Sequence, residues 1–298
     1  MSPEITYAIP YYRGLGYLQK AIQSVVNQEN SNWLLHVLDD CGGEDAEELV
    51  SSFRDDRITY VRNVRNMGLA GNWNKALSLA TTDLITLLHA DDELETTYTD
   101  EILALMSRHS DAVAGHCRAT IIDESGRSTW SLPDEVKKFI RPHSKMDIIT
   151  EGEEGLLSLV KGAWIFCPAM CYRVARIPVG GFTQEWKMVL DIELMSRILL
   201  NGGEIVGTTQ AAYRYRRHTD NQTQELTKSA VRFQEEIALL DIIATQCSER
   251  GWNRVARSAR RKTIVRLHLM YQSLLSLISL NLSHSRKLLI ASVTLRFR

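Results

Sequence analysis

The chain has 298 residues, of which 44% are hydrophobic and 24% charged, and its net charge is −1. This composition is ordinary for a globular protein, and the length allows one large domain or one domain with an appendage. The five cysteines are scattered without a close C-x-x-C pair, which argues against a zinc site and favours reduced thiols. The apolar stretch between Glu4 and Arg13 is too short for a signal peptide, so we expect a cytoplasmic protein.

Strands and helices alternate in the first part of the chain. Apolar runs predict strands over 5–9, 33–38, 58–61 and 84–88. Apolar residues at helical spacing predict helices over 15–28, 46–53 and 72–80. Pro10 is expected to stop the first strand. This alternation implies a parallel sheet with right-handed crossovers, and no G-x-G-x-x-G fingerprint of a dinucleotide site follows the first strand.

Two of these strands end on paired carboxylates. Asp39 and Asp40 follow the second strand, and Asp91 and Asp92 come just after the fourth. In an open α/β sheet, ligands bind just outside the carboxyl ends of the strands. Carboxylates at that edge suit a hard divalent cation such as Mg²⁺, which prefers one or two carboxylates together with substrate phosphates. Taken alone, such a pair is equally compatible with a solvated turn or a helix N-cap.

The middle of the chain is less regular. Helices are expected over 98–109 and 153–161, and strands over 112–119, 163–172 and 204–215. Residues 121–127 have hairpin character, and we expect a loop or lid over 130–150. A tight turn at 180–182 precedes a helix that carries Asp191 in its first half and is capped by Gly202-Gly203.

The C-terminal part is predicted to be helical and is strongly basic. Residues 250–298 hold eleven of the 35 lysines and arginines and no acidic residue, so the rest carries 24 basic against 36 acidic residues. A helix is expected over 227–250. The uncharged stretch from Leu267 to Ser285 is too polar to span a bilayer. Its one-sided apolar pattern and basic flanks are typical of a helix in a membrane interface, or of one packed on this domain or on a second subunit.

Five segments in order resemble the inverting glycosyltransferases of family 2, which have the GT-A fold. They are Ala8–Tyr12 for the opening P-x-Y turn, Leu38–Gly42 for V-D-D-G-S, Asn66–Ala76 for N-x-G-x-x-x-x-N, His89–Asp92 for D-x-D, and Gly180–Phe182 with Asp191 for G-G-F…E-D. The resemblance extends from Ile5 to Thr223, about three quarters of the chain. It implies a mixed, mostly parallel sheet flanked by helices, followed by a C-terminal helical extension.

The resemblance implies a donor pocket formed by the first strands. Pro10, Tyr12 and Asp39 would line the pocket for the base and ribose, with Asp39 bonded to the base, and Asp40 would support that loop. Asn66 and Asn72 would shape the wall near the sugar and ribose. Tyr12, as an amphipathic aromatic residue, is also compatible with simple packing.

The resemblance also implies the reacting groups. Asp91 would bind Mg²⁺ or Mn²⁺ and bridge it to the diphosphate, and Asp191 would be the general base. His218 is a secondary metal or diphosphate contact, and a purely structural histidine is the alternative. Asp191 also has a simpler interpretation, as a surface acid paired with a neighbouring Lys187 or Arg197.

Two positions depart from the family pattern. His89 replaces the first aspartate of D-x-D; a neutral imidazole can hydrogen-bond ribose but supplies no charge. Leu190 stands where many members have an acid before the base, which leaves Asp191 with Glu193 as a fallback. The tryptophans Trp130, Trp164 and Trp186 could stack on acceptor sugars, although core burial is their default role.

The prediction is therefore a metal-dependent inverting glycosyltransferase, with a domain over 1–223 and a basic helical extension over 224–298. Its expected partners are a UDP-, GDP- or TDP-sugar and a glycan or lipid-linked acceptor, with peripheral membrane contact through 250–298 or a homo-oligomer. Aromatic residues are not interleaved in the basic tail, so we expect no nucleic acid partner. The rivals are a nucleotidyltransferase, which would need a basic phosphate loop near Pro10–Gly16, and a degenerate sugar-binding relative.

Overall fold

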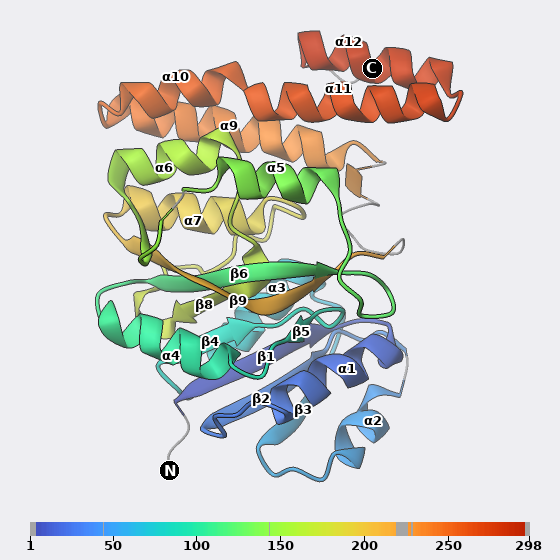
Figure 1. Cartoon of the computed structure of the whole chain (residues 1–298), viewed down its shortest axis with the longest axis vertical. Helices are drawn as coiled ribbons and strands as arrows, with labels where there is room; N and C mark the ends of the chain where they lie inside the picture. Colours follow the sequence, from blue (N-terminus) through green and yellow to red (C-terminus); the bar gives the residue numbers. More distant parts are fainter. Residues whose placement is uncertain (1–3, 44, 143, 219–225, 228, 296–298) are drawn as a thin grey trace.

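The computed structural model describes residues 4–43, 45–142, 144–218, 226–227 and 229–295. These residues form one nine-stranded mixed sheet with the strand order β3-β2-β1-β4-β8-β6-β9-β5, and β7 pairs with β9 beside this path. Helices cover both faces of the sheet (Figure 1). The predicted α/β architecture, with a mostly parallel sheet flanked by helices, is confirmed.

The first four strands are parallel and bring the carboxyl ends of β1, β2 and β4 to one edge. They are β1 (Ile5–Tyr11), β2 (Trp33–Asp39), β3 (Ile58–Arg62) and β4 (Leu84–Leu87). The prediction that Pro10 stops the first strand is wrong, since β1 runs on to Tyr11. Proline is tolerated because the register of β4 ends at Leu87 opposite Ala8, so one side of β1 has no strand partner at Pro10.

The second half of the sheet is mixed. It contains β5 (Glu93–Leu94), β6 (Ala114–Ile122), β7 (Ile148–Glu151), β8 (Met170–Arg173) and β9 (Glu204–Arg216). The antiparallel strand β8 joins β4 to β6, and β9 runs parallel to β6. The predicted strand over 163–172 is mostly wrong: Cys167–Ala169 form a short 3₁₀ turn around Pro168, and only Met170 onward pairs.

The helices on the two faces of the sheet pack against two separate hydrophobic clusters of the core. One face carries α1 (Leu15–Val26), α2 (Ala46–Ser52) and α4 (Tyr98–Arg108). The other face carries α3 (Gly68–Leu79), α6 (Gly152–Lys161) and α7 (Leu190–Leu200). Each helix buries one apolar stripe, as its spacing predicts.

Residues 130–150 are more ordered than the predicted loop or lid. They contain α5 (Leu132–Ile140) and strand β7. Helix α5 begins with a proline in its first turn and acidic residues near its N-terminus, both favourable there. The segment does carry apolar residues at helical spacing, namely Leu132, Val136, Phe139 and Ile140, which the expectation of a loop overlooked.

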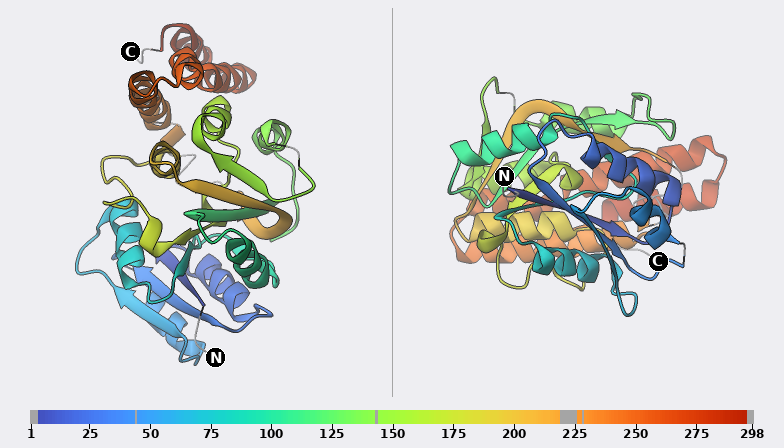
Figure 2. Two further views of the ribbon diagram at one scale, coloured as in Figure 1. Left: turned by 90° about the vertical axis from the view of Figure 1, so that its left-hand side faces the viewer. Right: turned by 90° about the horizontal axis from the view of Figure 1, so that it is seen from below.

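The C-terminal region forms a layer of helices at the end of the molecule opposite β3 and α2 (Figures 1 and 2). It consists of α9 (Val231–Glu249), α10 (Asn253–Arg261), α11 (Thr263–Ile278) and α12 (Leu282–Thr294). The uncharged stretch is two helices, separated at Leu280, whose φ is +60°. Within the described ranges, no helix combines the length and apolar character needed to cross a bilayer.

The predicted division at 223/224 falls within 219–225, outside the described residues. On either side of it, the two parts share a core. Phe233 and Leu239 of α9 and Val265 of α11 belong to the same hydrophobic cluster as Leu194 of α7. The separation into two domains stays a prediction.

Candidate active site

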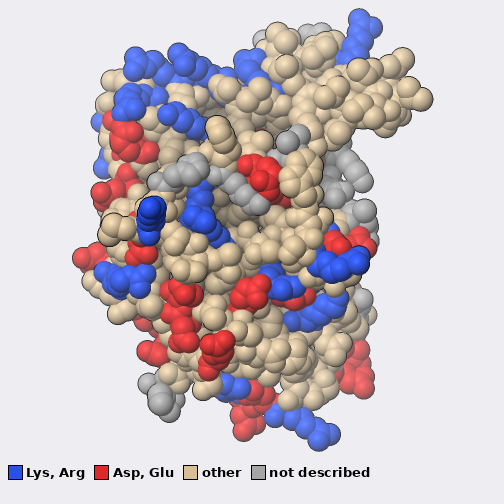
Figure 3. Space-filling model, in the orientation of Figure 1, with Lys and Arg blue, Asp and Glu red and all other residues tan. Residues whose placement is uncertain are grey.

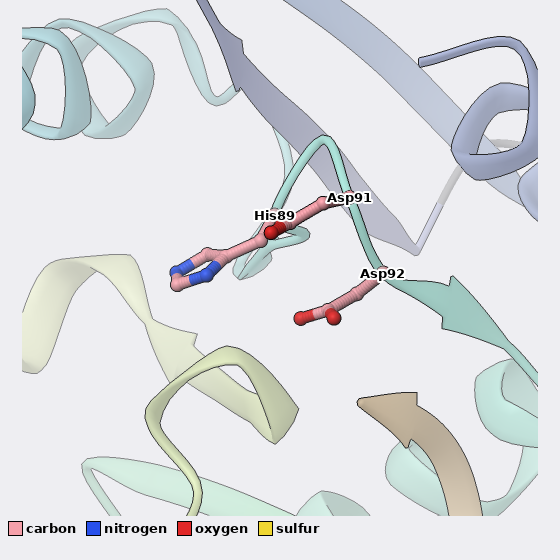
Figure 4. Close-up of side chains that lie close together, drawn as sticks. All are labelled: His89, Asp91 and Asp92. Atoms are coloured by element: carbon pink, nitrogen blue, oxygen red, sulfur yellow. The ribbon is translucent and has the colours of Figure 1, made fainter. Parts of the chain in front are cut away.

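The turn between β4 and β5 brings His89, Asp91 and Asp92 together. One potential ligand atom from each lies within 4.8 Å of the others, and all three side chains project from this turn (Figure 4). The apolar strand β4 is fully buried, so the polar turn emerges at the sheet edge, as the sequence predicts. The His89 ring lies 5.5 Å from that of Trp73 between ring centroids.

Asp91 is paired with His218. Nε2 of His218 lies 2.8 Å from Oδ2 of Asp91, and the histidine ring also lies against Tyr17 at 5.1 Å between centroids. Burial opposes ionisation of Asp91, but the hydrogen bond from His218 and the charges of His89 and His218 outweigh it. The pKa of Asp91 is therefore lowered. The two residues predicted to contact the metal thus lie side by side.

Asp92 has the opposite character. Burial and the neighbouring charge of Asp91 raise its pKa well above the ordinary value. Its oxygens accept hydrogen bonds from the Tyr213 hydroxyl at 2.9 Å and from the backbone N–H of Arg216 at 2.7 Å. Two adjacent carboxylates are thereby given separate roles: an ionised one at the surface of the site and a buried one that anchors β9.

Arg216 also belongs to this site, although the sequence analysis did not predict it as a site residue. Its guanidinium is fully buried, donates to the carbonyl oxygens of Asp91 at 2.8 Å and Asp123 at 2.8 Å, and forms an ion pair with Glu93. The arginine therefore fixes the turn that carries Asp91. The available signal was its position at the end of a β-rich strand, two residues before His218.

Asp39 is the last residue of β2 and Asp40 follows it, as predicted, and the two carboxylates have different partners in the fold. Asp39 accepts from the backbone N–H of Gly42 at 3.0 Å and from the Tyr60 hydroxyl at 2.6 Å. Asp40 accepts from the backbone N–H groups of Met67 at 2.8 Å and Gly68 at 2.9 Å. Asp40 therefore ties the end of β2 to the start of α3. Neither acts as the helix N-cap, since Asp45 caps α2.

The other predicted donor residues divide between surface and core. Asn66 is exposed and accepts from the backbone of Gly68, whereas Asn72 is buried and donates to the carbonyl oxygen of Leu38 at 3.0 Å. Pro10 is half-buried and Tyr12 is 50% exposed, which leaves its ring available. Buried Asn72 can shape the pocket wall only through its neighbours.

Asp191 lies in the first turn of α7 and is half-buried. Burial raises its pKa, and the backbone N–H of Ile192 and the charges of Lys137 and Arg232 oppose that rise. Lys137 comes from α5, and burial lowers its pKa to about 8. The structure does not pair Asp191 with Arg197, which instead binds Glu193 at 2.6 Å.

The thiol of Cys167 is affected by the charges of Asp191 and Asp92. Burial raises the pKa of its thiol, the charge of Asp191 raises it further, Lys137 opposes this, and Asp92 adds to the rise. Cys167 is therefore within electrostatic reach of both α7 and the β4–β5 turn. Glu193, the fallback base, accepts from Thr183 and Arg197 and is already committed to structure. Trp164 is buried in the core, whereas Trp130 is 68% exposed.

The side chains around Asp91 are suited to binding a divalent cation. Nε2 of His89 is buried and has no hydrogen-bond partner among the residues that the structure describes. It lies beside the Asp91 carboxylate, whose lowered pKa keeps it ionised. A carboxylate oxygen suits Mg²⁺ or Mn²⁺, and an imidazole nitrogen is a softer additional ligand. Asp91 is thus the principal candidate ligand, with His89 and His218 beside it.

Comparison with known proteins gives a consistent picture. The family model described as "Glycosyl transferase family 2" matches residues 6–159. A "GalNAc(5)-diNAcBac-PP-undecaprenol beta-1,3-glucosyltransferase" from Campylobacter jejuni is 30% identical over 130 residues, 42% of this chain and 40% of the relative. The first curated relatives are matched over 40% to 62% of their own length.

Solved structures resemble the fold over most of its length. TarS 1–349 from S. aureus in complex with UDP-GlcNAc has a TM-score of 0.67 at 15% identity, over 87% of this chain and 72% of that one. A mannosyltransferase from Pyrobaculum calidifontis in complex with GDP-Man and Mn²⁺ has a TM-score of 0.61 at 12% identity, over 98% and 86% of the two chains. At such identities the likeness establishes the fold alone.

Proposed function

Because the chain belongs to glycosyl transferase family 2, we propose that it transfers a sugar from a nucleotide-diphospho-sugar to a hydroxyl of a glycan or lipid-linked acceptor, with inversion and with Mg²⁺ or Mn²⁺. The observation that carries the proposal is the His89–Asp91–Asp92 turn at the carboxyl end of β4, whose side chains are close enough together to hold a divalent cation. The family match ends at residue 159, so the role of Asp191 rests on the sequence resemblance and on its position in the first turn of α7.

In this proposal the donor nucleotide binds over the ends of β1 and β2. Tyr12 offers an exposed ring to the base, whereas Asp39 is buried with its carboxylate oxygens bonded to Gly42 and Tyr60, so it would shape the floor of the base pocket. Asp40 acts indirectly by fixing the start of α3. Preformed hydrogen bonds of this kind reduce the entropy that donor binding must overcome.

The diphosphate is expected next to Asp91. A bound Mg²⁺ or Mn²⁺ would act there as a Lewis acid and stabilise the charge of the leaving diphosphate. Asp91, His89 and His218 are the residues that would hold it. His218 keeps the Asp91 carboxylate oriented, and Asp92 with Arg216 keeps the turn in place.

Asp191 is the proposed general base. Inversion by direct displacement needs one carboxylate that removes the acceptor proton on the face opposite the leaving group. The raised pKa of Asp191 increases its basicity, while the charges of Lys137 and Arg232 limit that rise.

The proposed acceptor is a glycan, free or attached to a lipid carrier. The relative from Campylobacter jejuni is named for an undecaprenol-linked acceptor, and TarS was crystallised with UDP-GlcNAc. These names support the class of substrate. Donor sugar and linkage are left to experiment.

Thermal unfolding with UDP-, GDP-, TDP- and CMP-sugars, each with and without Mn²⁺, tests the proposal. A ligand that binds the native state alone raises the midpoint by mass action. We expect a metal-dependent shift with one nucleotide. Absence of a shift with every donor would contradict the proposal.

A non-catalytic sugar-binding protein is the second candidate, because His89 removes one carboxylate from the metal motif. Asp191→Asn separates the two. A transferase loses turnover but keeps the donor-induced thermal shift, with Glu193→Gln on the same helix as the control for general damage to α7. A binding protein shows the same shift with no turnover in either the parent or the variant.

A further inference from the structure

Helix α11 carries an apolar stripe that no described residue covers. Leu267, Met270, Leu274, Leu277 and Ile278 are between 48% and 70% exposed. Their spacing places them on one side of the helix, while Val265, Leu269 and Ser273 face inward and are buried. Exposed apolar residues scattered singly need no explanation, but a continuous stripe marks an interaction surface.

Helix α12 extends this surface. Its exposed apolar residues are Leu282, Leu289, Ile290 and Val293, each between 51% and 71% exposed. We call these four residues, together with the five of α11, the hairpin ridge. In Figure 3 the α11–α12 end of the molecule is the largely tan projection at the upper right.

The hairpin that carries the ridge is firmly closed. The Ser273 hydroxyl donates to the carbonyl oxygen of Ser285 at 2.8 Å, and Arg266 donates to the carbonyl oxygens of Ser292 at 2.8 Å and Val293 at 2.6 Å. Leu288 and Ala291 of α12 are buried against the core. The ridge is therefore the outer face of a packed hairpin.

Basic side chains lie beside the ridge, and Arg286 lies on its α12 part, four residues from both Leu282 and Ile290. Arg257, Arg260 and Arg261 are exposed on α10, and Arg286 and Lys287 are exposed on α12. Figure 3 shows Lys and Arg side chains to the left of this projection and at its upper edge, and no acidic side chain on it in this view. Arg254 and Lys262 differ, because they pair with Glu154 and Asp241.

The charge pattern distinguishes between two occupants. If two copies of the chain paired through their ridges about a two-fold axis, the same basic flanks would meet, and residues 250–298 contain no acidic residue to compensate. An anionic bilayer offers apolar depth for the ridge and negative head groups for its flanks.

We propose that the hairpin ridge docks on an anionic lipid bilayer, with α11 and α12 lying in the plane of the interface. Leu274 and Ile278 enter the boundary between head groups and acyl chains, and Arg286 and Lys287 contact the phosphates. The inference does not depend on the transfer reaction, since its test measures lipid binding without donor or acceptor.

The test is flotation of the full chain with vesicles of pure phosphatidylcholine, and with vesicles of equal parts phosphatidylcholine and phosphatidylglycerol. We expect binding to the anionic vesicles that weakens as salt rises, because salt screens the basic contacts. Binding that is equal for both vesicles, or absent from both, overturns the proposal.

Two double variants locate the surface. Leu274→Gln with Ile278→Gln should lower anionic-vesicle binding at least tenfold, whereas Val179→Gln with Ile149→Gln, at exposed positions outside the hairpin, should leave it unchanged. All four side chains are more than half exposed, so the thermal midpoint should stay the same. If the first pair instead converts a dimer to a monomer in gel filtration without affecting vesicle binding, the ridge joins two copies and the proposal fails.

A second pair tests the charged flank. Arg286→Gln with Lys287→Gln should weaken binding and reduce its salt dependence, while Lys20→Gln with Lys161→Gln, which changes the net charge equally at exposed positions elsewhere, should not. Equal effects of the two pairs would mean that net charge alone governs the contact, and would overturn the assignment to the hairpin ridge.

Discussion

His218 lies with its Nε2 atom 2.8 Å from Oδ2 of Asp91, although 127 positions separate the two residues in sequence. The contact joins the end of β9 to the turn after β4. It also supports the lowered pKa of Asp91, against the effect of burial. The geometry of the candidate metal ligand thus depends on a residue from the other half of the sheet.

His218→Asn should weaken Mn²⁺ binding about tenfold or more, because groups that orient a ligand typically contribute that much to metal affinity. Calorimetric titration of the protein with Mn²⁺, without nucleotide-sugar, measures this affinity. His109→Asn is the matched control, since His109 pairs with Asp147 at 3.2 Å on another part of the molecule. Equal Mn²⁺ affinity in His218→Asn and the parent would remove His218 from the site.

Asp191→Asn should lower turnover about a hundredfold or more, as expected for a lost general base, and should stabilise the fold at neutral pH. Burial raises the folded-state pKa of Asp191, so its contribution to the free energy of unfolding falls as pH rises from the unfolded pKa through the folded one. Above that window the ionised carboxylate destabilises the fold, and asparagine removes this penalty.

Urea unfolding measured at neutral pH, and again at a pH below the ordinary aspartate pKa, checks this pH dependence of the stabilisation. The gain from Asp191→Asn should be present at neutral pH and vanish in acid. Glu193→Gln on the same helix should have the opposite effect at neutral pH, because Glu193 is held by Arg197 and Thr183. A loss of stability in Asp191→Asn at neutral pH would contradict the assigned environment.

Lys137→Met should shift the acidic limb of the rate profile toward neutral pH. The positive charge of Lys137 lowers the pKa of Asp191, so its removal lets that pKa rise further. Because the pKa of Lys137 is about 8, the lysine is charged throughout the acidic range in the parent. The pH dependence of kcat/KM measures the shift, and Lys161→Met at an exposed position should leave the limb in place. A limb that moves toward lower pH would refute this electrostatic coupling.

Gly42→Ala should reduce donor affinity about tenfold, which corresponds to about 1.4 kcal/mol. A Cβ at position 42 would overlap the carbonyl oxygen of Tyr12, so the two loops over the donor pocket must separate. Gly16→Ala is the control, because a Cβ there meets nothing within 4 Å. Titration with the donor found in the nucleotide panel measures the change. Wild-type affinity in Gly42→Ala would place the donor elsewhere.

The sequence predicts the strand–helix alternation of the first half well, because each strand is a short apolar run and each helix has a clear stripe. The four predicted strands agree with β1 to β4 within two residues at each end. The errors occur where local pattern conflicts with tertiary context. Pro10 continues a strand because its neighbour β4 has ended, and α5 was overlooked although Leu132, Val136 and Ile140 follow helical spacing.

For the candidate site, sequence spacing places Asp91 at the sheet edge but cannot reveal its partners. Arg216 is a buried cation whose acceptors are mainly backbone carbonyl oxygens, and no residue pattern marks such contacts in advance. Lys137 was missed because it lies in the segment predicted to be irregular. Contacts that join distant segments of a chain arise from the packed fold, so they become visible only in three dimensions.

Strand β9 has a consequence for how the protein is made. The ribosome releases the turn with Asp91 and Asp92 long before Tyr213, Arg216 and His218, which hold those carboxylates in the finished fold. A nascent chain that ends near residue 159 therefore contains the whole region of the family match but only half of the site. Its two adjacent carboxylates lack the partners that hold them in place, so we expect the metal site to form only when β9 enters the sheet.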